Sequence, residues 1–152
     1  MNSVTVSVRD IQKPAWMARS ISFCKKVLRC LCLDNCELSV VFCTNDFIRS
    51  LNKTFRGKDE PTDILSFSQE EGAELPGRGR GARIIGDMVI SLDMLVTNGQ
   101  DFSVPEEEEL KRLLVHGILH LAGQDHKGTG PEEPMLIRQE EILMELSEER
   151  IF

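Results

Sequence analysis

Apolar and polar positions change their spacing along the chain, and these changes predict the order of its elements. Alternation or short apolar runs predict strands at residues 4–8, 37–43, 63–67 and 83–91. The last run is almost continuously apolar, which is typical of a buried central strand. Apolar residues at helical spacing predict helices near residues 14–31, 45–56, 92–97, 105–121 and 132–148.

This order predicts an α+β fold with a small mixed four-stranded sheet packed with about five helices. No internal repeat or linker interrupts the pattern, so residues 1–152 are expected to form one domain. A helix capped by Thr44 or Asn45 would carry Ile48, Leu51 and Phe55 on one face and would stop at Gly57.

The fourth predicted helix has the clearest signals of all. Residues 103–106, Ser-Val-Pro-Glu, read as a capping box, and residues 106–109 place four glutamates at the positive end of the helix dipole. Lys111 and Arg112 are expected on a solvated face. The expected buried stripe of this helix is Leu110, Leu113, Leu114, Gly117, Ile118 and Leu121. On the final helix, the expected core side is Leu136, Ile137, Ile142, Leu143 and Leu146.

Composition narrows the class of protein. Hydrophobic residues make up 41% of the chain and charged residues 28%, which is ordinary for a soluble globular domain. No apolar run approaches the roughly 20 residues of a membrane span, and the N-terminus lacks a secretory pattern. Five cysteines cannot all pair internally, which favours reduced thiols in the cytoplasm. The cysteines at 24, 30 and 32 lie in an apolar helical stretch and are expected to be core thiols rather than metal ligands.

All three histidines of the chain fall between residues 116 and 126, with the spacing H-x-x-x-H-x-x-G-x-x-H. That is the ligand spacing of the metzincin zinc proteases. Those enzymes carry a glutamate general base directly after the first histidine, where this chain has Gly117. The pattern therefore favours a metal-dependent hydrolase that is not a peptidase.

The spacing has a physical reason. His116 and His120 lie a turn apart on one helix face, at the edge of the buried stripe, where they could bind one ion. Gly123 allows the chain to reverse and bring His126 to the same ion. Three histidines leave an open position for water, as in a catalytic zinc site, so one zinc ion per chain is expected. Asp125 would orient a ligand or assist the water.

Two basic segments interrupt an acidic chain with a net charge of -7. One is a glycine-rich stretch containing Arg78 and Arg80, and the other contains Lys53, Arg56 and Lys58. Net acidity argues against nonspecific coating of nucleic acid, but local basic groups can bind phosphates. A solvated loop whose arginines maintain solubility remains the alternative for the first segment.

Together these residues resemble the YbeY family of metal-dependent endoribonucleases. Residues 116–126 match the family signature H-G-x-L-H-L-x-G-x-D-H in full. Residues 51–56 and 61–67 resemble L-N-x-x-x-R and P-T-D-V-L-S-F, and residues 85–91 are similar to L-G-D-I-x-I-S. Ile64 replaces the usual valine, and Ser68 stands where proline is common; both departures are mild.

The resemblance implies a zinc-dependent, single-strand-specific endoribonuclease that matures the 3′ end of small-subunit rRNA and acts in ribosome quality control. It implies that Arg56 is the functional arginine, that the three histidines bind zinc, and that the ribosome or its proteins are partners. Lys53, Arg78 and Arg80 are further candidates for RNA contact. The sequence does not indicate the oligomeric state.

Two other functions stay open. One is a metallohydrolase of another class, a peptidase or amidase with Asp125 as its base, and the other is a noncatalytic ribosome-assembly factor. Gly117 costs a helix roughly 1 kcal/mol relative to alanine, so a local reason for it is expected. It would either leave space for a nucleotide or let a neighbouring element pack closely.

Overall fold

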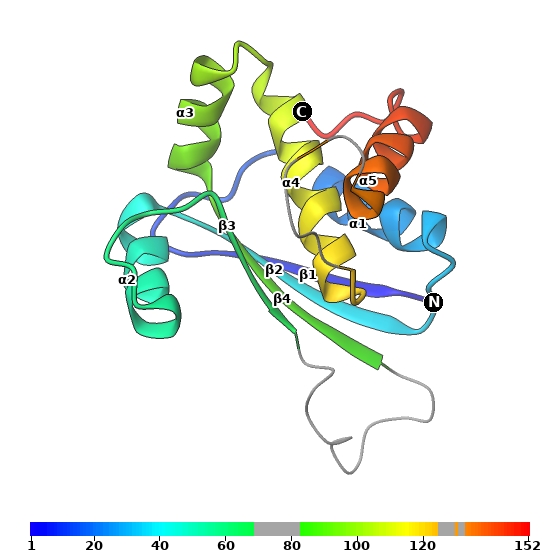
Figure 1. Cartoon of the computed structure of the whole chain (residues 1–152), viewed down its shortest axis with the longest axis horizontal. Coiled ribbons are helices and arrows are strands. Elements are labelled where there is room, and N and C mark those ends of the chain that lie inside the picture. Colours follow the sequence, from blue (N-terminus) through cyan, green and yellow to red (C-terminus); the bar gives the residue numbers. More distant parts are fainter. Residues whose placement is uncertain (69–82, 125–129, 131–132) are drawn as a thin grey trace.

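The computed structural model describes residues 1–68, 83–124, 130 and 133–152. The protein consists of a four-stranded sheet with helices against both faces. Figure 1 shows this arrangement. The predicted order of elements is confirmed. The elements are β1 (Ser3–Val8), α1 (Met17–Cys30), β2 (Cys36–Cys43), α2 (Asn45–Arg56), β3 (Ile64–Ser68), β4 (Arg83–Ser91), α3 (Leu92–Asp101), α4 (Glu106–Leu121) and α5 (Pro134–Glu145).

The strands lie in the order β1-β2-β4-β3. β1, β2 and β4 are parallel, while β3 pairs antiparallel with β4 and forms one edge of the sheet. β4 therefore lies between two strands, as its apolar run predicted. The carbonyl of Asp63 accepts a hydrogen bond from the amide of Ser91 (3.0 Å), which fixes the start of β3 beside the end of β4.

Two apolar clusters divide the core between the faces of the sheet. The larger cluster joins α1, α4 and α5 to one face and includes Met88 and Ile90 of β4. The smaller cluster packs Ile48 of α2 against Leu65 of β3 and Val89 of β4 on the other face. Because successive residues of a strand point to opposite faces, β3 contributes to both sides. β3 consequently lies between α2 and α4, as both views show.

Helix ends confirm one prediction and correct another. Thr44 caps α2 by accepting a hydrogen bond from the amide of Phe47 (3.3 Å), and Gly57 ends α2 with φ of 70°. The capping box at residues 103–106 is wrong, because α4 begins at Glu106 after Pro105 with no side-chain cap. Ser103 instead has φ of 55° and closes α3: its amide bonds to Gln100 and the next amide bonds to Gly99, the pattern of a Schellman motif.

The first turn of α4 does more than complement the helix dipole. The buried Glu107 carboxylate accepts hydrogen bonds from the amides of Ile151 (2.8 Å) and Phe152 (2.7 Å) and from the Arg150 guanidinium (3.0 Å). Burial opposes ionisation, but these donors outweigh it and hold the pKa of Glu107 below its usual value. Lys111, expected on a solvated face, is only 2% exposed, and its charge also favours the ionised Glu107.

Three smaller expectations need correction. Ile137 is 45% exposed, and the buried positions of α5 are Met135, Gln139 and Ile142. α3 extends to Asp101, beyond the predicted end at residue 97. Of the three cysteines expected in the core, Cys24 is buried and Cys32 is exposed, because the chain leaves α1 at Cys30.

Within the described ranges, no helix is long and apolar enough to cross a membrane.

Candidate metal centre and cleft

His116 and His120 lie on the last two turns of α4, at the border between its buried stripe and the open cleft beside β3. Every expected stripe position, from Leu110 to Leu121, is buried, whereas both histidines are partly exposed. Their Nε2 atoms lie 3.1 Å apart, and their rings meet edge to face with centroids 4.7 Å apart. The predicted pair therefore presents two ring nitrogens to one point in the cleft.

Gln139 of α5 holds the His116 ring from behind. Its buried Oε1 lies 2.7 Å from His116 Nδ1, and an amide oxygen can only accept a hydrogen bond. The proton must therefore be on Nδ1, which leaves the lone pair on Nε2 for a ligand. Sequence reasoning missed Gln139, although it is the one polar member of the buried positions of α5.

The spacing of the two Nε2 atoms fits a shared metal ion. Two nitrogens bound tetrahedrally to zinc at the usual bond lengths lie about 3.3–3.4 Å apart, close to the 3.1 Å seen here. Among the residues with described positions, no three ligand side chains converge. His126 and Asp125 fall outside those residues. Gly123 has the positive φ (94°) that the predicted reversal needs, and the return of His126 to the same ion stays a prediction.

Arg56 faces the histidines across a cleft of about 490 Å³. The cleft lies along β3, between the end of α2 and the end of α4. Its walls are Arg56, Thr62, Asp63, Ile64, Leu65, Ser66, Ser68, His116, His120 and Leu121. The structure thus brings Arg56 and the histidine pair into one hollow, although they are 60 residues apart in sequence at their closest.

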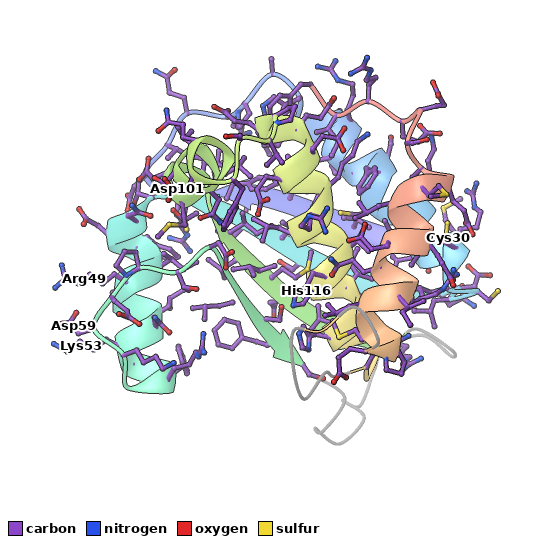
Figure 2. All side chains as sticks on the ribbon, turned by 45° about the horizontal axis from the view of Figure 1, so that its top comes forward. Cys30, Arg49, Lys53, Asp59, Asp101 and His116 are labelled. Carbon is purple, nitrogen blue, oxygen red and sulfur yellow. The ribbon has the colours of Figure 1, made fainter. Side chains whose placement is uncertain are left out.

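The other basic candidates lie elsewhere or outside the described chain. Lys53 is on the outer side of α2, where Asp59 lies 3.9 Å from its ammonium and 2.8 Å from Arg49 Nε. Figure 2 shows this group on the side of α2 that points away from α4 and His116. Arg78 and Arg80 belong to residues that the structure does not describe, so their role stays a prediction.

The carboxylate of Asp63 anchors the floor of the cleft. One of its oxygens accepts from the amide of Ile64 (2.8 Å) and the other from the side chain of Asn98 (3.2 Å). Burial raises the pKa of the nearby Glu109 of α4, and the negative charge of Asp63 adds to this increase. These contacts hold β3 at a fixed position relative to α3 and α4.

Gly117 points away from the cleft and into the core. A Cβ at this position would lie 2.4 Å from Met88 Sδ and 2.8 Å from Ile64 Cδ1, distances that real Cβ atoms do not show. The space is filled by the sheet, so the alternative of room for a nucleotide is wrong and close packing explains the glycine. A glutamate at this position, where a peptidase has its general base, would require the Met88 and Ile64 side chains to move.

Comparison with known proteins agrees with this architecture. The sequence profile of the family described as Endoribonuclease YbeY matches residues 2–147. Endoribonuclease YbeY of Treponema denticola is 46% identical, over 99% of this chain and 97% of the relative. Endoribonuclease YbeY of Borreliella burgdorferi strain B31 is 46% identical, over 81% and 82%. The solution structure of TM1509 from Thermotoga maritima has a similar fold, with a TM-score of 0.61 and 23% identity over 97% of this chain and 93% of that one.

Proposed function

The chain belongs to the YbeY endoribonuclease family, and we propose that it is a zinc-dependent endoribonuclease whose metal site is His116, His120 and His126. Family membership makes it a hydrolase that acts on RNA and serves rRNA processing. The finer proposal is cleavage of unpaired RNA near the 3′ end of small-subunit rRNA, with the ribosome as partner, in the cytoplasm and in ribosome quality control.

The observation that carries the zinc proposal is the pair of Nε2 atoms 3.1 Å apart, with Gln139 behind one ring and Arg56 across the cleft. A bound zinc ion would supply Lewis-acid polarisation of the phosphodiester and a more acidic water. Imidazole also suits copper, nickel and iron, so metal analysis decides the identity of the ion.

The protein's own side chains supply the rest of the chemistry. The attack of water or of a neighbouring 2′-hydroxyl puts negative charge on the nonbridging phosphate oxygens. Arg56 offers a planar fork of N–H donors that matches two of these oxygens. Gln139 keeps the His116 proton on Nδ1. Asp63, whose two oxygens each accept one hydrogen bond, holds the wall of the cleft in place.

Replacing Arg56 with alanine is expected to reduce cleavage of single-stranded RNA about 100-fold or more, as when one donor to a developing oxyanion is lost. Zinc content and melting temperature should stay near wild type, because Arg56 is exposed and is not one of the predicted ligands of the metal. Arg56→Lys should restore little, since a point charge does not reproduce the fork. The measurement is the rate of cleavage of a defined oligomer, with and without a chelator.

Arg49→Ala is the matched control, because Arg49 is also an exposed arginine of α2 but pairs with Asp59 outside the cleft. Arg49→Ala should cleave RNA at the wild-type rate. Wild-type cleavage by Arg56→Ala would remove this residue from the active site. A casein digest run beside the RNA assay tests the peptidase alternative, and robust proteolysis by the native protein would replace the proposed function.

Gln139→Leu is expected to weaken zinc binding about 10- to 100-fold, the usual cost of losing a partner that orients a metal-binding histidine. Leucine keeps the volume of the side chain but cannot accept from Nδ1. Gln139→Glu restores an acceptor and should bind zinc at least as tightly as the native protein. Competition with a chromophoric chelator measures these affinities, and unchanged affinity in Gln139→Leu would contradict the role of Gln139.

A further inference from the structure

Phe55, on the last turn of α2, is 63% exposed. Helical spacing predicted that it would share the buried face of α2 with Ile48 and Leu51. Ile48 is fully buried, whereas Phe55 lies where the helix passes the edge of the sheet. A phenylalanine that is left this exposed keeps a large apolar ring in water, so its surroundings need examination.

The exposed ring is supported by a second aromatic side chain. Phe67 of β3 meets Phe55 edge to face, with ring centroids 5.2 Å apart and planes at 69°. Phe67 in turn packs on the smaller apolar cluster beside Leu51 and Leu65. Phe55 is thus held against a fixed neighbour, and the greater part of its ring remains open to solvent.

This aromatic pair does not line the cleft, but both of its members are sequence neighbours of residues that do. The residue after Phe55 is Arg56, which lines the cleft, and the neighbours of Phe67 on β3, Ser66 and Ser68, also line it. Because side chains alternate along β3, Phe67 faces α2 while Ile64 faces Gly117 of α4. Phe55 is therefore adjacent to Arg56 on the last turn of α2, on the side of β3 that faces α2.

We propose that Phe55 is a stacking platform for an unpaired nucleobase of the RNA substrate, next to the phosphate held by Arg56. The proposal rests on the endoribonuclease function. Stacking on an aromatic ring needs one face of the base to be free, which single strands provide and duplexes do not. It is also tolerant of sequence, because every base has such a face. Phe55 would therefore select unpaired RNA without selecting a particular base.

The experiment compares Phe55→Ala, Phe55→Trp and Phe102→Ala in the zinc-loaded protein. Phe102 is a matched control, because it is 66% exposed and lies at the end of α3, where its sequence neighbours do not line the cleft. The substrates are a short single-stranded RNA and the same RNA with one abasic position beside the cleavage site. Both KM and kcat are measured, together with binding by fluorescence anisotropy and the melting temperature of each variant.

Phe55→Ala should raise KM roughly 5- to 100-fold, the range that stacking on one aromatic side chain provides, with a smaller change in kcat. Phe55→Trp should restore tight binding, and Phe102→Ala should match wild type. The abasic RNA should bind wild type about as weakly as intact RNA binds Phe55→Ala. The melting temperature should change little, because the ring is mostly exposed.

Equal KM for Phe55→Ala and wild type, with normal cleavage by both, would overturn the stacking proposal and leave the proposed function intact. The proposal is also overturned if Phe55→Ala loses affinity for intact RNA but the wild-type protein binds abasic RNA as tightly as intact RNA. The ring would then contribute to binding without stacking on that base. A native protein that neither binds nor cleaves the RNA would overturn both proposals.

Discussion

The double variant His116→Ala, His120→Ala is expected to purify without zinc, while the native protein carries about one ion per chain. The variant lacks two of the three predicted ligands, and the Nε2 atoms that lie 3.1 Å apart are lost together. RNA cleavage should fall to background. Elemental analysis of both proteins after the same purification gives the result directly. Full metal occupancy in the double variant would reject the assignment.

The metal-free protein should still fold, because the sheet and its two apolar clusters form a core that does not include the histidines. Zinc should nevertheless stabilise the native protein, since it binds only the folded chain. At 1,000 times the dissociation constant this contribution is about 4 kcal/mol, or roughly 10 °C for a domain of this size. Native protein stripped by a chelator and reloaded is the control. A random-coil spectrum for the stripped protein would mean that the metal is structural.

Gly117→Glu is expected to prevent folding instead of converting the protein into a peptidase. The glutamate Cβ would lie within 2.4 Å of Met88 Sδ, and its carboxylate would be buried against the sheet. Overpacking costs roughly 1–3 kcal/mol, and an unpaired buried charge adds several more, which together approach the whole stability of a typical domain. Soluble yield and thermal unfolding report this, and a stable, active Gly117→Glu protein would contradict the packing argument.

A smaller change keeps the argument testable if Gly117→Glu is wholly insoluble. Gly117→Ala gains about 1 kcal/mol of helix propensity but places a methyl group in the contact with Met88 and Ile64. We expect a net loss of stability. Met88→Ala should be less damaging when combined with Gly117→Ala than alone, because the added methyl group then fills part of the vacated space. Additive effects would show that the two residues do not compete.

The fold was largely predictable because local signals marked its parts. Alternation at residues 4–8 indicated a strand, and the apolar run at 83–91 indicated a central strand. Thr44 and Gly57 bounded α2. Two errors have different causes. Ser103 closes α3 through hydrogen bonds to Gln100 and Gly99, a local motif that competes with the predicted capping box. Lys111 is buried near Glu107, whose carboxylate binds the distant amides of Ile151 and Phe152, and no pattern within α4 indicates that contact.

The sequence could name candidate site residues but not their arrangement. The spacing of His116 and His120 follows from helical periodicity alone, and their position at the edge of the buried stripe follows with it. Gln139 and Phe55 could not be assigned, because their roles depend on α5 packing behind α4 and on β3 passing beside α2. The roles of His126, Arg78 and Arg80 stay predictions, since these residues lie outside the described chain.

The packing at Gly117 also bears on how this protein could evolve. A single base change can turn a glycine codon into a glutamate codon, so mutation readily offers the peptidase-like motif. Met88 of β4 and Ile64 of β3 occupy the volume that the new side chain would need, so both side chains would have to move. Nuclease and protease activities that share one histidine spacing are thus separated by a steric barrier in the core. A lineage could cross that barrier by first changing the side chains at positions 64 and 88.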